Sequence, residues 1–206
     1  MRKVGDRNPV LLIHGIDDTA DVFSTMAPYL RVKGWQTYGL DLIPCNGDVG
    51  LDLLAQQVAD YVTQPFPAHQ PIDLVGFSMG GIISRYYVQR LGGIEQVQRF
   101  VTISSPHQGT WTAYLRPNIG AAQMRWGSPF MNALNRDVDI LKKLHFTSIW
   151  TPLDLMIVPA ESSRIPVGQE VVVNVPAHSW MLTHNRSLQA VCNALATPLP
   201  ARIKTC

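Results

Sequence analysis

Residues 72–81 read IDLVGFSMGG, and this stretch is the most informative part of the sequence about its fold. The apolar run 72–75 predicts a buried strand, and apolar residues at helical spacing follow the stretch. Between them, residues 76–80 fit the pattern G-x-S-x-G, in which a serine occupies a sharp turn whose strained backbone tolerates only small neighbours. The stretch therefore predicts a strand, a tight turn that exposes Ser78, and a helix. A glycine-rich turn with an incidental serine is the alternative.

Other apolar runs bounded by turn residues predict five more strands. They cover residues 9–13, 36–40, 100–103, 147–150 and 171–175, and 72–77 is the third of the six in chain order. Apolar side chains recur every three to four residues in 51–62, 82–91 and 188–195, which predicts helices with one buried face. Strands that are apolar throughout and alternate with helices form parallel sheets covered on both faces. We expect one α/β domain over residues 1–206, with about six mostly parallel strands.

Residues 107–144 depart from this alternation, because a bare connection between strands is usually much shorter. The segment holds several large apolar side chains: Trp111, Tyr114, Met124, Trp126, Phe130 and Met131. We expect helices and an apolar flap that serves as a lid or cap. Ordinary core helices are the alternative, since aromatic and methionine side chains are mostly just buried.

Composition and charge exclude several classes of function. The formal net charge is only +2 and the basic residues are scattered, which excludes a nucleic-acid partner. The cysteines Cys45, Cys192 and Cys206 are widely spaced without nearby histidines, and neither a zinc nor a nucleotide motif occurs, so we expect no metal and no cofactor. No apolar run approaches the roughly 18 residues of a membrane span. We expect a cytoplasmic monomer that makes at most transient contact with a membrane surface.

The dipeptide His14-Gly15 follows the first predicted strand, at the carboxyl edge of the sheet. The backbone N–H groups of Ile16 and of Met79, the residue after the serine, are therefore predicted to converge on an oxyanion. Each such donor is worth roughly 3 kcal/mol of barrier. An ordinary turn that closes a strand is the alternative.

A serine in this position becomes a nucleophile when a histidine takes its proton and a carboxylate holds the other ring nitrogen. On such a scaffold the three follow one another as serine, acid, histidine. Asp154 comes four residues after the strand 147–150, at the carboxyl edge, and is the predicted acid. Its rivals are Asp137, Asp139 and Glu161, which lie in a helical stretch or far beyond the strand.

Two histidines follow that acid. His178 comes three residues after the predicted strand 171–175 and is the predicted base, whereas His184 lies a turn or two further on, where it would point elsewhere. His107 precedes the acid in the chain, so we expect it to make a structural hydrogen bond.

These motifs together resemble the α/β-hydrolase superfamily and, within it, bacterial triacylglycerol lipases, including the small lidless kind. The resemblance covers residues 9–15, 72–81, 104–110, 146–158 and 175–182. It implies a minimal α/β-hydrolase fold without the first two strands of the larger members. It also implies Ser78 as nucleophile, Asp154 as acid, His178 as base, and Ile16 and Met79 as oxyanion donors. The calcium-binding acids of larger lipases have no counterpart here.

The predicted function is hydrolysis of acyl esters, lipid esters above all, through an acyl-serine intermediate. The predicted substrate-binding side chains are Phe77, Trp111, Leu115, Trp180 and Met181. A thioesterase or acyltransferase would use the same acyl-serine, and a non-catalytic binding module would keep the fold without the chemistry. Acyl-CoA or acceptor consumption separates the first two from a hydrolase, and a covalent serine probe separates the third.

Overall fold

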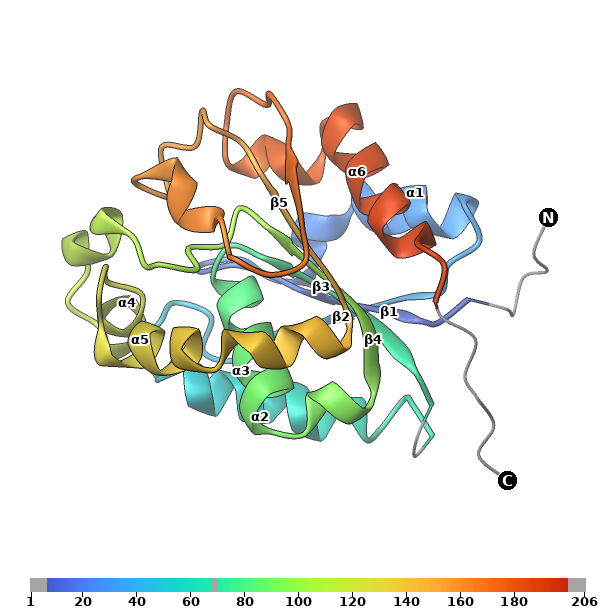
Figure 1. Ribbon diagram of the computed structural model, residues 1–206, viewed down its shortest axis with the longest axis horizontal. Coiled ribbons are helices and arrows are strands. Elements are labelled where there is room, and N and C mark those ends of the chain that lie inside the picture. Colours follow the sequence, from blue (N-terminus) through green and yellow to red (C-terminus); the bar gives the residue numbers. More distant parts are fainter. Residues whose placement is uncertain (1–6, 68–69, 200–206) are drawn as a thin grey trace.

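The computed structural model describes residues 7–67 and 70–199. In this part of the chain, six strands form one sheet in the order β2-β1-β3-β4-β5-β6, and every neighbouring pair is parallel (Figure 1). The strands are β1 (Val10–Ile13), β2 (Thr37–Leu40), β3 (Ile72–Phe77), β4 (Val97–Ile103), β5 (His145–Trp150) and β6 (Gln169–Val172). Because all run the same way, the residues that follow their carboxyl ends meet at one edge of the sheet. The predicted fold class is confirmed.

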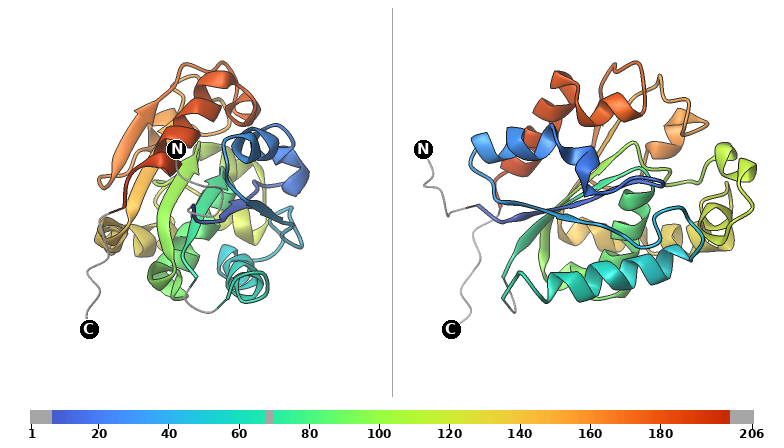
Figure 2. Two further views of the ribbon diagram at one scale, coloured as in Figure 1. Left: turned by 90° about the vertical axis from the view of Figure 1, so that its right-hand side faces the viewer. Right: turned by 180° about the vertical axis from the view of Figure 1, so that it is seen from behind.

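Helices cover both faces of the sheet (Figures 1 and 2). The α-helices are α1 (Met26–Val32), α2 (Leu51–Val62), α3 (Met79–Arg90), α4 (Ile119–Gln123), α5 (Pro129–Arg136) and α6 (Asn185–Ala196). Helices α2 and α3 pack on one face and α1 and α6 on the other, and each face has its own buried apolar cluster. The central strands β1 and β3 are buried along their whole length, as a sheet covered on both sides requires.

The last strand occupies other residues than the sequence predicts. Residues 171–175 were expected, but β6 begins two residues earlier and ends at Val172. It is an edge strand, and its first residues, Gln169 and Glu170, are exposed and polar, so apolar patterning does not reveal them. Beyond it, the Val173 amide still bonds the Trp150 carbonyl at 2.9 Å before the chain leaves the sheet.

The long segment after β4 contains the helices that the sequence predicted. Besides α4 and α5 it forms the 3₁₀ turns η3 (Trp111–Leu115) and η4 (Val138–Lys143). In Figure 1 the yellow-green first part of this segment and the orange loop after β5 lie at the same end of the sheet, and the later part runs back along one face to the start of β5. The segment is tied to the body by Arg85, whose fully buried guanidinium donates to the Leu134 carbonyl and to the Asn135 side chain.

The remaining 3₁₀ turns are η1 (Ala20–Phe23), η2 (Gly93–Glu95), η5 (Ala160–Ser163) and η6 (Ser179–Leu182). Among the described residues, no helix combines the length and the apolar character that crossing a lipid bilayer requires.

Candidate active site

Ser78 occupies the turn between β3 and α3, at the carboxyl edge of the sheet. Its φ of 53° and ψ of −123° are strained for a residue with a side chain, as the sharp strand-to-helix turn, or elbow, of a G-x-S-x-G pattern requires. Met79 begins α3, so the serine stands at a helix N-terminus, where negative charge is favoured. The prediction of strand, turn and helix is confirmed.

The elbow is held by backbones that approach one another closely. A Cβ on Gly80 would overlap the carbonyl oxygens of Ile13 and His14, and a Cβ on Gly81 would overlap the Ser105 hydroxyl. Only glycine leaves room for β1 and β4 to approach α3 in this way. The glycines after Ser78 therefore fix the elbow by shape.

Asp154 and His178 meet above this edge. Asp154 Oδ2 lies 2.7 Å from His178 Nδ1, while Oδ1 accepts the amides of Met156 and Ile157 at 2.9 Å each. The Asp154 side chain is almost fully buried, and that of His178 is 12% exposed. A second contact joins the two loops, since the Thr151 hydroxyl donates to the Val175 carbonyl at 2.7 Å. The imidazole is thus held by a carboxylate through one nitrogen, with Nε2 left for another partner.

The Asp154 carboxyl has a lowered pKa although burial acts to raise it. The hydrogen bond and the charge of His178, together with the Ile157 and Met156 amides, outweigh the burial. The carboxylate therefore stays ionised and keeps the Nδ1 proton on its side of the ring.

The other candidate base and acids do not take part in this pair. His184 is the N-cap of α6, and its Nδ1 accepts the Arg186 amide at 3.2 Å. Asp137 forms an ion pair with Arg90, and Asp139 with Lys142. Glu161 lies in η5.

His178 also lies close to the elbow. Its ring packs against the Phe77 ring, one residue before Ser78, with 4.7 Å between centroids. Among the described residues, Ser78 Oγ has no hydrogen-bond partner, so the structure joins Asp154 to His178 but draws no bond from Ser78 to His178. In sites without substrate this contact is commonly long and tightens only when substrate binds.

The loop after β1 is held by the His14 ring. Its Nε2 accepts the Leu42 amide at 2.9 Å, so Nδ1 carries the proton and donates to the Gly15 carbonyl at 2.8 Å. Because a trans peptide directs its N–H opposite to its C=O, this bond also sets the direction of the Ile16 N–H. The backbone N–H groups of Ile16 and Met79 donate to no acceptor among the described residues. The sequence marked His14-Gly15 as a loop but gave no sign of this role for the ring.

An apolar cavity of about 260 Å³ opens beside Ser78. Its walls come from the Ile16 loop, from η3 and α4, and from the acid loop after β5. They are Ile16, Ser78, Pro106, Thr110, Thr112, Ala113, Leu115, Arg116, Ala121, Met124, Leu155, Met156 and Ile157. The run 155–157 was not singled out from the sequence, although three apolar residues directly after Asp154 are a usable signal. The cavity is suited to an apolar chain that ends at the serine.

Of the five predicted substrate-binding side chains, Leu115 lines this cavity and four lie elsewhere. Phe77 is buried under the His178 ring, and Met181 is fully buried in the core with α6. Trp111 is half exposed and stacks on Tyr114 and Trp126. Trp180 is half exposed on η6, beside His184. Side chains that are close in sequence lie apart in the structure, because the 3₁₀ turns η3 and η6 direct successive side chains to different sides.

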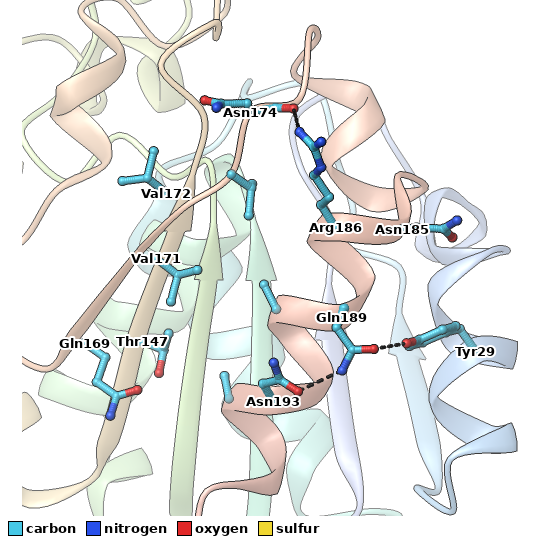
Figure 3. Close-up of a pocket in the computed structure, with 13 residues that line it drawn as sticks. Tyr29, Thr147, Gln169, Val171, Val172, Asn174, Asn185, Arg186, Gln189 and Asn193 are labelled. Carbon is cyan, nitrogen blue, oxygen red and sulfur yellow. Dashed lines mark hydrogen bonds between the residues drawn. The ribbon is translucent and has the colours of Figure 1, made fainter.

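A larger open groove of about 800 Å³ lies between β6 and α6, away from these residues. Figure 3 shows its amide side chains bonding one another, with the Tyr29 hydroxyl donating to Gln189 and Gln189 to Asn193. No candidate catalytic residue lines it.

His107 has the structural position expected of it. It is fully buried, its Nε2 lies 2.9 Å from the Thr102 hydroxyl, and Arg85 approaches Nδ1 at 3.4 Å. Burial, followed by the Arg85 charge, keeps its pKa well below 6.5. Within residues 7–67 and 70–199, no three histidine, cysteine, aspartate or glutamate side chains form a group that could hold a metal ion.

A parallel sheet with an elbow serine and a carboxylate-bound histidine at one edge defines a class of enzyme folds. Residues 8–191 match the family described as alpha/beta hydrolase fold, and the chain belongs to that family. This membership supports a hydrolase.

Solved structures of enzymes share the fold at low sequence identity. Mature Bacillus licheniformis lipase BlEst2 superposes with a TM-score of 0.76 at 16% identity, over 93% of each chain. Aspergillus fumigatus lipase B gives 0.78 at 17% identity, over 96% of this chain, which spans only 55% of that one. A pyrethroid hydrolase from Sphingobium faniae gives 0.63 at 16% identity, over 93% of this chain and 98% of that one.

Proposed function

We propose that the protein is a serine ester hydrolase that cleaves acyl esters, including lipid esters, through an acyl-serine formed at Ser78. The observation that carries the proposal is the 2.7 Å contact between buried Asp154 and His178, above an elbow serine with φ of 53°. A base held by a carboxylate at a strained serine is the arrangement that nucleophilic acyl transfer needs.

In the proposed reaction, Ser78 Oγ attacks the ester carbonyl while His178 Nε2 takes the hydroxyl proton. The negative oxygen of the tetrahedral intermediate accepts the amides of Ile16 and Met79. The intermediate collapses, the alcohol leaves with the proton from His178, and the acyl group stays on Ser78. Water then repeats the sequence and releases the acid. Asp154 remains ionised and stabilises the imidazolium.

The cavity next to Ser78 favours a substrate with an apolar acyl group. Its volume of about 260 Å³ is small, so short and medium chains would be enclosed and longer chains would extend past its rim. The rim side chains Leu115, Leu155 and Met156 are 84%, 82% and 54% exposed. Exposed apolar side chains at the mouth suit a lipid ester or a lipid surface.

The segment 107–144 is proposed to provide the Leu115 side of this rim rather than a freely swinging cap. Its far end is tied to α3 through Arg85, and Trp111 donates its amide to the Val158 carbonyl at 2.9 Å in the acid loop. Movement would therefore be confined to the exposed apolar side chains of η3, such as Leu115.

Hydrolysis of p-nitrophenyl esters of graded chain length tests the proposal. We expect turnover that is greatest for short and medium chains, and a loss of at least about 10⁴-fold in folded Ser78→Ala. Ser84→Ala, in the same helix, is the matched control and should keep full activity. No turnover with any chain length, or equal rates in wild type and Ser78→Ala, would contradict the proposal.

A further inference from the structure

Asp18 places a second carboxylate beside the candidate nucleophile, and the reaction above does not use it. A Cβ built on Gly15 would lie 3.2 Å from Asp18 Oδ2 and equally 3.2 Å from Ser78 Cβ. The Phe77 ring, which packs on His178, lies 3.4 Å from the same point. Asp18 and Ser78 therefore flank one glycine, close to His178.

The surroundings of Asp18 leave its charge free to act on a ligand. Among the described residues its carboxylate has no hydrogen bond and no ion pair, whereas its neighbour Asp17 pairs with Arg116. His14 lies near it, but that ring is neutral because its Nε2 accepts the Leu42 amide. Partial burial raises the Asp18 pKa, while the nearby His14 and His178 would lower it if protonated and Asp17 raises it further.

Asp18 and His178 both lie outside the apolar cavity beside Ser78. The apolar cavity is lined by Ser78 and Ile16 but not by Asp18 or His178. Since the histidine gives its proton to the leaving alcohol, the alcohol part of an ester must face His178. The acyl chain then occupies the apolar cavity, and the alcohol part lies towards Asp18.

We propose that Asp18 determines specificity for the alcohol part of the ester, favouring a cationic group such as a quaternary ammonium over a neutral group of the same shape. This inference rests on the proposed ester hydrolysis. An uncompensated carboxylate attracts a nearby cation, and the attraction is strongest where water is partly excluded. The transition state of a neutral ester gains nothing comparable from it.

Two butyrate esters test the proposal: butyrylcholine and 3,3-dimethylbutyl butyrate, which has carbon in place of the charged nitrogen. The measured quantity is kcat/KM for butyrylcholine divided by kcat/KM for the neutral ester, at about pH 8, where a free carboxylate is ionised. We expect Asp18→Asn, which keeps the side-chain shape, to lower the ratio about tenfold, as loss of one charge at contact range would. Asp21→Asn, the same change three residues away, should leave it unaltered.

A second measurement needs no variant. Raising the salt from about 0.01 M to about 1 M should lower the wild-type ratio, because salt screens a partly exposed charge. A ratio that neither Asp18→Asn nor salt changes, with Ser78-dependent turnover of both esters intact, would overturn the role of Asp18 alone. Absence of Ser78-dependent turnover of either ester would overturn the ester hydrolysis and this inference together.

Discussion

The elbow and the acid–histidine loops lie at the same edge of the sheet but are held in different ways. The elbow is fixed by backbone contacts, since α3 passes so close to β1 that no Cβ fits on Gly80. The loops carrying Asp154 and His178 are fixed by polar contacts: the carboxylate–imidazole bond, two amides on Asp154, and the Thr151–Val175 bond.

Because the two regions are held by different kinds of contact, substitutions in them should affect different properties, namely stability at the elbow and activity at the loops. Close packing cannot be altered without moving strands, so changes at the elbow should destabilise the whole sheet. Polar contacts at the loop ends can be removed while both apolar clusters stay intact, so changes there should mainly lower activity.

The largest expected effect is on activity, from the loops. Asp154→Asn leaves the ring of His178 without its carboxylate and favours the wrong tautomer, so ester turnover should fall about 10⁴-fold. Circular dichroism and the melting temperature should change little, because the apolar clusters are untouched. A variant that keeps activity within tenfold would show that another group orients the histidine; Glu161→Gln is the matched control.

The next effect is on stability, from the elbow. Gly80→Ala should lower the free energy of unfolding by at least about 3 kcal/mol, because the added methyl overlaps two backbone carbonyls of β1 and its loop. Gly92→Ala is the comparison. No atom lies within 4 Å of its added methyl, so it should cost only the strain of a φ of 83°, about 1 kcal/mol. Equal costs in urea titrations would refute the steric account of the elbow.

A smaller effect is expected where the two regions meet. His14→Ala removes the bond that orients the Gly15–Ile16 peptide, so kcat should fall about 10- to 100-fold. The fall should be smaller than the roughly 10³-fold that complete loss of an oxyanion donor can cause. KM should stay near the wild-type value, because only the transition state carries the negative oxygen. A raised KM with unchanged kcat would place His14 in substrate binding instead.

The smallest effect is the pH dependence of loop stability. The pKa of Asp154 is lowered in the folded protein, so its contribution is fully present above its ordinary value of 3.8 and is lost as pH falls through the lower, folded value. The stability advantage of wild type over Asp154→Asn, which is small, should therefore be constant near neutrality and shrink below about pH 4. An advantage that grows on acidification would mean that the carboxyl is held protonated.

The sequence predicted the features that depend on local pattern. The strand–turn–helix around Ser78 was predictable because its glycines and flanking apolar residues are neighbours in sequence, and the parallel sheet was predictable from strands that are apolar on both faces. Strand β6 was misplaced because an edge strand carries polar residues such as Gln169 and Glu170. The bond from the Leu42 amide to His14 and the placement of Asp18 and Ser78 around Gly15 join residues that are distant in the chain, so they leave no pattern in the sequence.

Covalent labelling shows whether His178 activates the Ser78 hydroxyl. A fluorophosphonate reacts with a serine only when a base takes its proton, and mass spectrometry locates the adduct. We expect a single adduct on Ser78 in wild type, with labelling slowed by orders of magnitude in folded His178→Ala. An unlabelled Ser78, or equal labelling rates in wild type and His178→Ala, would contradict it.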